Sequence, residues 1–589
     1  MILQALNDYY WRKVADPDPA RRLPAFGLEE KEIPFIIVID AQGRWLPPIQ
    51  DTRCKVGKKV MGRRFLVPAA VKRSSGVAAN LLWDTAEYVL GIDMRGKPKR
   101  VAEQHAAFRA RIDALPGPAA SLPGVVAVRK FLDAIDLAAL AADPLWPEIL
   151  ESNPFIGLQL QGEIELICQH QEIKKALAAV VGEAGDTEMA YCLVTGEHAP
   201  VERLHAPIKG VWGAQSSGAN IVSFNLDAFN SYGKTQGANA PVGKPAAFAY
   251  TTALNHLLGR DSRQRVQVGD ASTVFWAEKP CDFETLLPDL FGEPPKDDPD
   301  RGTRALETLY RSIRSGHFVS DDDDTRCHVL GLAPNAARIA VRFWQTGTVA
   351  ELGRRLRRHF DDLEVARGSN DPRHLPLFRL LTSIAVQGKA ENIPPNLGGE
   401  IVRAVLAGEE NPYPTALLNA AVDRCRAERR VTYPRAAILK ACLNRQIRRA
   451  NQIFPSTPEK EFSPMLDPKH PSPAYRLGRL FAVLEKIQEE ASPGLNATIR
   501  DRYYGAASST PVAVFTTLLR LKNHHLEKLS PGRRTYFERL IGEIMDGIAD
   551  FPRLLPLPEQ GRFALGYYHQ RQDFYTRKPE PNTSEGEAQ

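Results

Sequence analysis

The side chains of this sequence that could do chemistry are mainly cations, and they are concentrated in three segments. Residues 53–73 contain eight Lys and Arg with no Asp or Glu. Residues 424–449 contain nine Lys and Arg against Glu428 alone, and residues 354–359 read RRLRRH. One such segment is typical of a solvated face. Three together indicate a surface that binds the phosphates of a nucleic acid.

The acid-free segment predicts phosphate contacts. The run of cations is interrupted by Phe65, Leu66, Val67 and Val71, which ties the segment to a folded element. We expect a helix to begin after Gly76, where hydroxyls and N–H groups beside two cations would bind an anion. The alternative is a plain N-cap at Ser74 or Ser75. The predicted phosphate ligands are Lys58, Lys59, Arg63, Arg64, Lys72, Arg73 and Ser74.

Residues 210–242 carry only Asp227 and Lys234 as charges but many amides, hydroxyls and glycines. Asn and Gln present a donor beside an acceptor, which suits the edges of bases. The alternative is a set of tight turns whose amides bond their own backbone. The predicted base-reading or strand-wedging residues are Asn80, Gln215, Ser216, Ser217, Asn220, Asn230, Gln236 and Asn239.

The second basic segment predicts a helix from Pro434, because proline is tolerated in a first turn. Its apolar positions 438, 439, 442 and 447 define an inward face. The opposite face is expected to be a solvent-facing stripe for a nucleic-acid backbone, formed by Arg435, Lys440, Arg445, Arg448 and Arg449.

Catalytic motifs are missing from the sequence. It contains no HExxH, GxSxG or GxGxxG helix start. The loop at 237–245 is not a phosphate-binding loop, because its glycine spacing is too long and Pro245 replaces the Ser or Thr. We therefore expect a binding protein rather than an enzyme, with no catalytic residue and no cofactor.

Metal-ligating residues are present but poorly arranged. The acids Asp321–Asp324 could bind a cation, although they are more typical of a solvated hairpin loop before the strand pattern CHVLGL. Cys192, His198 and His205 have irregular spacing for zinc. His359 and the acids 361–362 do not converge on a helix. We expect no metal site.

Composition limits the class of protein. The chain has 589 residues, of which 43% are hydrophobic and 25% charged, with a net charge of +6. That is enough to build several cores. The mean hydropathy is −0.30, and no run of about 18 apolar residues predicts a membrane span. Seven scattered cysteines without a CxxC pair, and no signal peptide, predict a cytoplasmic protein.

We predict an α+β fold, with an irregular mixed N-terminal region and a mostly helical C-terminal region ending in a helical bundle. The expected domains are 1–290, 303–455 and 475–575, followed by a disordered tail at 576–589. The proline-rich stretch 455–475 is the sharpest expected boundary. A hairpin is expected at 35–45, and a helix at 476–491 with Leu477, Leu480, Phe481, Leu484 and Ile487 on one face.

Several long strings resemble the CRISPR-associated Csd family, the large subunit of the type I-C Cascade effector complex. They are VKRSSGVAANLLWDTAEYVLG, GAQSSGANIVSFNLDAFNSYGKTQGANAPV, GLAPNAARIAVRFW, YRLGRLFAVLEKIQEEA and NATIRDRYYGAASSTPVAVF. The similarity runs from Met1 to about residue 572. It implies a non-catalytic protein with an irregular α/β N-terminal part and a helical C-terminal part.

The resemblance also implies partners. They are a guide CRISPR RNA, other Cascade backbone and small subunits, target double-stranded DNA, and a helicase–nuclease recruited for antiviral defence. The large subunit would recognise the protospacer-adjacent motif, promote R-loop formation and stabilise the displaced strand. Residues 53–80 and 210–239 would then read the motif, and the stripe on 435–449 would hold the displaced strand or the guide backbone.

The resemblance further implies a separate small subunit made from an internal start, for which Met465 is the first candidate and a nearby non-Met codon the alternative. Two other functions stay open from the sequence. One is a metal-dependent nucleic-acid hydrolase that uses Asp321–Asp324 with His328 or His359. The other is a structural ribonucleoprotein scaffold without DNA contacts.

Overall fold

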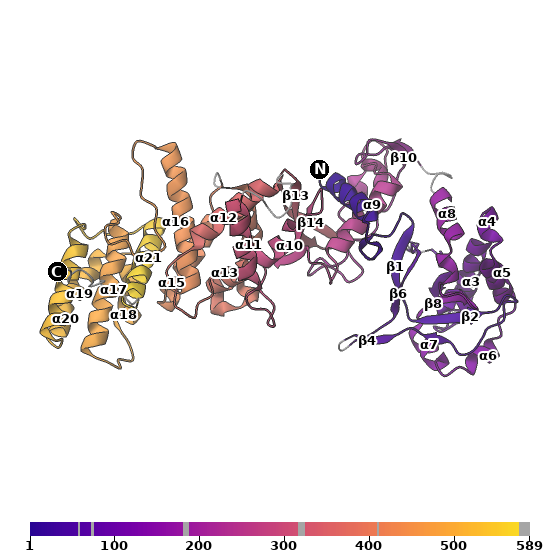
Figure 1. Cartoon of the computed structure of the whole chain (residues 1–589), viewed down its shortest axis with the longest axis horizontal. Coiled ribbons are helices and arrows are strands. Elements are labelled where there is room, and N and C mark those ends of the chain that lie inside the picture. Colours follow the sequence, from indigo (N-terminus) through magenta and orange to yellow (C-terminus); the bar gives the residue numbers. More distant parts are fainter. Residues whose placement is uncertain are drawn as a thin grey trace, which may run out of the picture. The chain divides into compact units, whose positions relative to one another are not determined.

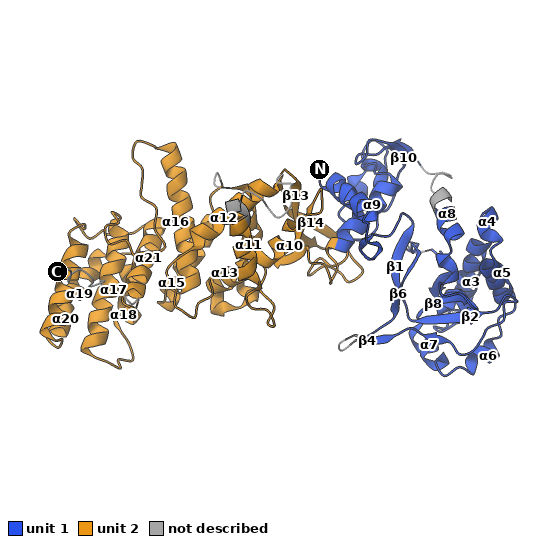
Figure 2. Ribbon diagram, viewed as in Figure 1, with its two compact units in different colours: residues 1–208, 220–256 blue, residues 209–219, 257–589 orange. Residues whose placement is uncertain are grey.

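The computed structural model describes residues 1–56, 59–71, 73, 76–180, 188–315, 324–408 and 411–575. Their contacts divide the chain into two compact units (Figure 2). Unit 1 comprises Met1–Ile208 and Asn220–His256, and unit 2 comprises Lys209–Ala219 and Leu257–Gln589. The segment 210–242 is therefore shared between the units. The predicted tail 576–589 lies outside the described residues.

Unit 1 is built on a mixed four-stranded sheet of order β3-β2-β8-β7, formed by β3 (Gln50–Asp51), β2 (Phe35–Ile39), β8 (Phe155–Leu160) and β7 (Trp83–Thr85). Only the central pair β2–β8 is parallel. The strand β2 reads FIIVI because it is buried on both faces. The hairpin predicted at 35–45 is confirmed by a bridge between Ile39 and Trp45.

Helices surround this sheet and continue into the second part of unit 1. They are α1 (Ile2–Val14), α2 (Ala86–Leu90), α3 (Pro98–Asp113), α4 (Gly117–Ala120), α5 (Pro123–Asp133), α6 (Leu137–Ala141), α7 (Trp146–Ser152), α8 (Gln171–Val180) and α9 (Lys244–Leu257). A small two-stranded sheet pairs β9 (Met189–Tyr191) with β10 (His198–Pro200).

A separate β-ribbon also belongs to unit 1. The strand β1 (Leu28–Ile33) pairs antiparallel with β6 (Arg63–Pro68), with Glu32 opposite Arg64. Beyond this pair, β4 (Cys54–Val56) and β5 (Lys59–Met61) form a short hairpin, which Figure 1 shows at the free end of the ribbon. We call residues 52–64 the basic hairpin.

Unit 2 begins with an antiparallel sheet of order β11-β12-β13-β14: β11 (Arg265–Val268), β12 (Ala271–Ala277), β13 (Arg326–Asn335) and β14 (Arg338–Thr348). The strand predicted from CHVLGL is confirmed as β13. The helices that follow are α10 (Phe283–Phe291), α11 (Arg301–Ser315), α12 (Val349–Leu363), α13 (Leu377–Ile384) and α14 (Leu397–Ala407).

The rest of unit 2 is helical, so the predicted α+β class with a helical C-terminal region is confirmed. Its helices are α15 (Thr415–Glu428), α16 (Tyr433–Ile453), α17 (Pro473–Ala491), α18 (Ile499–Ala507), α19 (Val512–Leu526), α20 (Pro531–Met545) and α21 (Leu557–Asp573). The face predicted on 476–491 is buried in α17.

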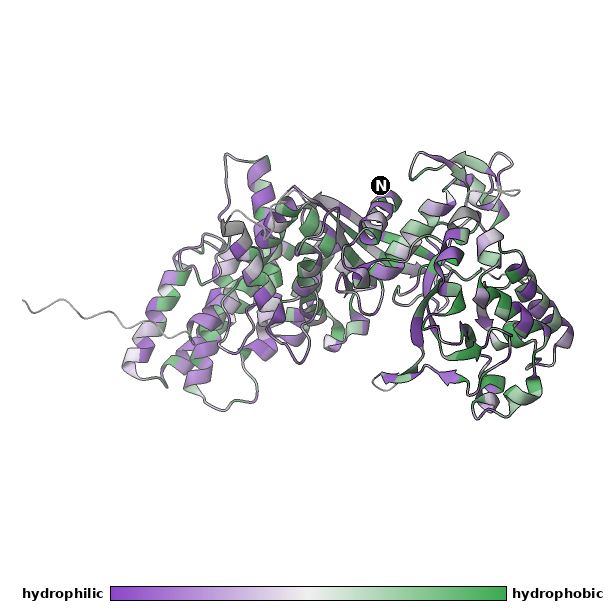
Figure 3. Ribbon diagram, turned by 45° about the vertical axis from the view of Figure 1, so that its right-hand side comes forward, coloured by the Kyte–Doolittle hydropathy of each residue, from purple (hydrophilic) through white to green (hydrophobic). Residues whose placement is uncertain are grey.

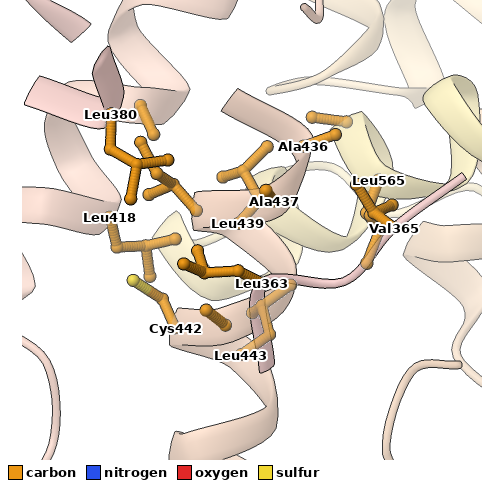
Figure 4. Close-up of a cluster of buried hydrophobic side chains, with 14 of the residues drawn as sticks. Leu363, Val365, Leu380, Leu418, Ala436, Ala437, Leu439, Cys442, Leu443 and Leu565 are labelled. Atoms are coloured by element: carbon orange, nitrogen blue, oxygen red, sulfur yellow. The ribbon is translucent and has the colours of Figure 1, made fainter. Parts of the chain in front are cut away.

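One hydrophobic cluster extends through unit 2, from Val268 to Tyr568. In Figure 4, Leu439 of α16 lies among Leu363, Leu418 and Leu565, which come from α12, α15 and α21. The core therefore continues on both sides of the proline-rich stretch 455–475. The helices combine hydrophilic and hydrophobic residues (Figure 3), and among the described residues none is long and apolar enough to cross a membrane.

The helices α17 and α21 approach each other at two glycines. A β-carbon on Gly478 would collide with the carbonyl oxygen of Phe563, and one on Gly566 would collide with that of Tyr475. Each glycine therefore lets one helix lie directly against the backbone of the other. Neither glycine has a positive φ, so close packing rather than backbone conformation requires it.

We predict that Gly478→Ala destabilises the protein by about 1–3 kcal/mol, because the added methyl overpacks a fixed backbone contact. The matched control is Gly542→Ala in α20, where an added methyl meets no atom. This change should be neutral or stabilising by up to about 1 kcal/mol. Urea unfolding followed by circular dichroism measures both, and equal effects would contradict the packing account.

Three buried histidines of unit 2 are held neutral. Burial lowers the pKa of His359 and His569 to about 3 and that of His470 to about 4. Each ring is hydrogen-bonded inside the core: His359 to the Tyr413 hydroxyl, His569 to the Tyr475 hydroxyl and His470 to the Lys460 carbonyl.

We predict that unit 2 loses stability as the pH falls below about 6.5, the pKa of an unfolded histidine. The folded-state pKa values are lower, so the unfolded chain binds more protons in this window. Each histidine should contribute a loss of about 1.4 kcal/mol per pH unit. Urea midpoints at pH 7, 6 and 5 measure this, and the triple variant H359Q/H470Q/H569Q should show a flatter pH dependence. An unchanged slope would contradict neutral burial.

Candidate nucleic-acid interface

Three exposed cations of the acid-free segment lie on the basic hairpin, and Arg73, which is also exposed, lies outside it. Lys55 on β4 and Arg63 and Arg64 on β6 are exposed. The Arg64 Nε lies 3.9 Å from a carboxylate oxygen of Glu32, a distant and solvated ion pair that leaves the guanidinium accessible. The Arg63 guanidinium lies over the ring of Phe65, 5.1 Å from its centre. Lys58 lies outside the described residues, as does the side chain of Lys59.

The base of the basic hairpin is fixed by polar contacts. The Arg53 side chain donates to Asp51 and Glu148 and lies 4.6 Å from the centre of the Phe35 ring. The Thr52 hydroxyl donates to the Ile33 carbonyl and accepts from the Arg63 N–H at 3.2 Å. These contacts hold the hairpin on the ribbon, so its outer cations are presented by a supported element rather than a loose tail.

The helix predicted to begin after Gly76 is wrong, and Lys72, Ser74 and Ser75 of the anion site predicted beside it lie outside the described residues. The next elements are β7 at Trp83 and α2 at Ala86. The cause is Asp84, whose carboxylate is fully buried and accepts from the Asn80 N–H at 2.8 Å and from Arg73. Burial raises the pKa of Asp84 in spite of Arg73.

Arg73, a predicted phosphate ligand, and Asn80, a predicted base-reading residue, both make contacts within the protein here. The Arg73 guanidinium also donates to the Ala78 carbonyl and lies over the Tyr88 ring at 4.1 Å. Asn80 is 2% exposed, and its side-chain oxygen accepts from the Val71 N–H. Lys72 and Ser74 lie outside the described residues.

The polar side chains of 210–242 that were predicted to read bases fall into two groups. Gln215, Ser216 and Ser217 are exposed on a turn of unit 2, and Asn230 is exposed in unit 1. The other group bonds backbone, as the alternative interpretation holds. The Asn220 amide donates to the His205 carbonyl at 3.0 Å.

Asn239 organises the loop before it. Its amide donates to the carbonyls of Gln236 and Lys234, and its oxygen accepts from the Ser231 N–H. The side chain thereby closes residues 231–239 into a compact loop. Gln236 has a φ of +48° within this loop and is half-buried.

Tyr232 is a residue that our site prediction omitted. It lies at the tip of the turn Ser231–Lys234, where Tyr232 and Gly233 have φ values of +51° and +71°. Two positive φ values are the mark of a type I′ turn, which holds its tip in a defined position. The Tyr232 side chain is 99% exposed, beside the exposed Lys234. The signal in the sequence was an aromatic residue directly before a turn glycine.

The predicted solvent-facing stripe on α16 is wrong. Arg435, Lys440 and Arg445 are 5%, 2% and 1% exposed. The helix is surrounded, since α12, α13, α15 and α21 all pack against it. A period of 3.6 residues distinguishes two faces only when one of them meets solvent. Of the five predicted cations, only Arg449 is exposed.

The buried cations of α16 cap the C-terminal ends of neighbouring helices. Lys440 donates to the carbonyls of Asp361 and Asp362 in α12, at 3.2 and 3.0 Å. Arg435 donates to the Ser383 carbonyl in α13, and Arg445 donates to the Ala404 carbonyl in α14. The last four carbonyls of a helix lack intrahelical partners and form the negative end of its dipole. These cations therefore donate to carbonyls at helix ends rather than to the phosphates of a nucleic acid.

Arg448 completes this arrangement as part of an ion pair. Its guanidinium donates to Asp362 at 2.5 Å and to Glu461 at 2.6 Å. The Asp362 side chain is 3% exposed. Burial raises the pKa of Asp362 and Arg448 opposes that rise, so the carboxylate depends on its partner.

The candidate metal residues are arranged for packing. Among the described residues, no group of three or more His, Cys, Asp and Glu side chains could hold a metal ion. Three of the acids in the run 321–324 lie outside those residues. His205 bonds the Tyr250 hydroxyl, and His328 stacks on Trp344.

Residues 6–575 match the family described as CRISPR-associated protein, Cas_Csd1. The chain belongs to this Csd1 family. The match covers nearly the whole chain, confirms the resemblance seen in the sequence and makes the protein a CRISPR-associated component of a Cascade complex. No curated protein matches the chain.

For this Csd1-family protein we predict that Arg448→Ala lowers stability by about 3–5 kcal/mol, because it leaves the buried Asp362 carboxylate unpaired. The neighbouring change Arg449→Ala should stay within about 0.5 kcal/mol, since Arg449 is exposed. Urea unfolding compares the two. Equally small losses of stability in both variants would contradict the burial of Arg448 and favour the predicted solvent-facing stripe.

Proposed function

We propose that this chain is the large, non-catalytic subunit of a type I-C Cascade complex. It would bind the protospacer-adjacent motif in double-stranded DNA, promote R-loop formation and stabilise the displaced strand. Its partners would be the guide CRISPR RNA, the other Cascade subunits and a helicase–nuclease that is recruited after the strands open. The observation that carries the proposal is the acid-free basic hairpin on a supported ribbon of a Csd1-family protein.

A two-stranded ribbon suits duplex DNA because the major groove admits this element. The exposed cations Lys55, Arg63 and Arg64 lie on the strands of the hairpin, where they can reach phosphates on the groove walls. The exposed Val60 on β5 adds an apolar side chain of the kind that contacts base edges or methyl groups. The guide RNA reads the target sequence, so the protein needs only a short motif and the backbone.

The turn at Tyr232 suits strand opening. An exposed ring on a fixed turn offers a stacking surface to an unpaired base, and Lys234 beside it can neutralise the adjoining phosphate. The exposed amides and hydroxyls of Gln215, Ser216, Ser217 and Asn230 stay candidates for reading the motif.

We predict that the double change R63A/R64A weakens binding of the guide-loaded complex to every duplex. Each phosphate contact that is lost should reduce the slope of log affinity against log salt by about 0.9, so the slope should fall by about 2 or less. Fluorescence anisotropy at several salt concentrations gives the slope.

The matched control for this prediction is R21A/R44A, which removes two cations of unit 1 that are 73% and 77% exposed. It changes the net charge equally, so it should leave the slope near its original value. A slope that is unchanged in R63A/R64A, or lowered equally in both variants, would favour a scaffold without DNA contacts through the hairpin.

We also predict that Tyr232→Ala reduces strand opening, at a cost of about 1–3 kcal/mol for the lost stacking. Tyr232→Trp should retain opening, because it keeps a stacking ring. Fluorescence of 2-aminopurine placed in the first target base pairs measures opening. The control is Tyr191→Ala, which removes an exposed ring on β9. Full opening in Tyr232→Ala would place the stacking group elsewhere.

A further inference from the structure

Two cysteines of unit 2 lie in contact beside the β12–β13 ladder. Cys327 is on β13 opposite Ala277, the last residue of β12. After Ala277 the chain turns back within four residues, and the side chain of Cys281 shares a hydrogen bond with that of Cys327. Both side chains belong to or pack against the same hydrophobic cluster.

The turn that brings them together is held by backbone contacts. The Glu278 N–H donates to the Arg326 carbonyl at 2.9 Å, which continues the ladder by one step. The Glu284 carboxylate accepts from the Ala277 N–H at 2.8 Å, which holds α10 against the end of β12. The proximity of the two thiols is therefore built into the fold rather than left to a loose loop.

The two thiols differ in accessibility. Cys281 is partly exposed just before α10, whereas Cys327 is 2% exposed. The Cys327 hydrogen bond lowers the pKa of Cys281, and the N–H groups of Phe283 and Glu284 lower it further, against burial and the Glu284 carboxylate. A partly exposed thiol with a lowered pKa, in hydrogen-bond contact with a second thiol, is the arrangement of an oxidisable pair.

We propose that Cys281 and Cys327 form a dithiol that hydrogen peroxide oxidises to a reversible disulfide. The Cys281 thiolate attacks one peroxide oxygen, the O–O bond breaks, and the departing hydroxide takes a proton to leave as water. The Cys327 sulfur then attacks the sulfur of the Cys281 sulfenic acid, the S–O bond breaks, and hydroxide leaves with the Cys327 proton as a second water. The two thiols lose two electrons and the peroxide gains them.

The disulfide would fasten the start of α10 to the strand β13 and close the chain from residue 281 to residue 327 into a loop. A dithiol reductant would reopen it. The pair is a chemical modification site of unit 2, and it is independent of whether the basic hairpin binds DNA.

The test treats the reduced full chain with hydrogen peroxide, blocks the remaining thiols with N-ethylmaleimide and maps the peptides without reduction. The expected result is a peptide joining Cys281 to Cys327, with the loss of both free thiols and their return after dithiothreitol. In the variant C327S, dimedone should instead label a sulfenic acid on Cys281. In C281S, Cys327 should stay reduced.

The control variant C54S removes the exposed thiol of β4 and should leave the 281–327 link unchanged. Because the first measurement uses the unaltered protein, it stands even if a variant folds poorly. Oxidation of Cys54 while Cys281 stays reduced would overturn the proposal. Equal dimedone labelling of Cys281 with and without Cys327 would overturn it as well, since Cys327 would then not react with the sulfenic acid.

Discussion

Each buried cation of this protein needs an acceptor, because removing an unpaired charge from water is costly. In unit 2 the acceptors are the unsatisfied carbonyls at helix ends. Lys440 and Arg445 on α16 reach the last turns of α12 and α14, and Arg355 adds a contact to the Leu406 carbonyl in the same turn of α14. Helices that would otherwise bury bare C-terminal carbonyls can therefore converge on one central helix. The hydrophobic cluster around α16 depends on this polar support.

The same requirement explains why the basic hairpin differs from α16. Between Thr52 and Arg64 the chain has no carboxylate of its own, and the strands β4 and β5 lie at the free end of the ribbon (Figure 1). Lys55 and Arg63 are consequently left facing water on a fixed element. A nucleic-acid phosphate can supply an acceptor to these exposed side chains. The charge density of the sequence is similar in the two segments. The elements packed around each segment decide whether its cations are buried or exposed.

The sequence predicted those features that local chemistry decides. The apolar face of α17, the start of α16 at Pro434 and the strand β13 follow from periodicity and proline geometry. The exposure of α16 could not be predicted, because it depends on helices that surround it from distant parts of the chain. The loop before β7 was predicted as a helix start. The residues around Asp84 in the sequence do not show that its carboxylate is buried and accepts from the Asn80 N–H. Tyr232 was not among the predicted site residues, although Gly233 marked the turn.

The central claim is that the basic hairpin lies against duplex DNA beside the target. The most direct test places a photo-crosslinking amino acid at Val60, which is 65% exposed on β5, in the guide-loaded complex. A parallel sample carries it at Leu137, which is 42% exposed on α6. Our account predicts crosslinks from position 60 to the duplex flanking the target, next to the protospacer-adjacent motif, and none from position 137. Absence of DNA crosslinks from position 60 in a complex that still binds its target would contradict it.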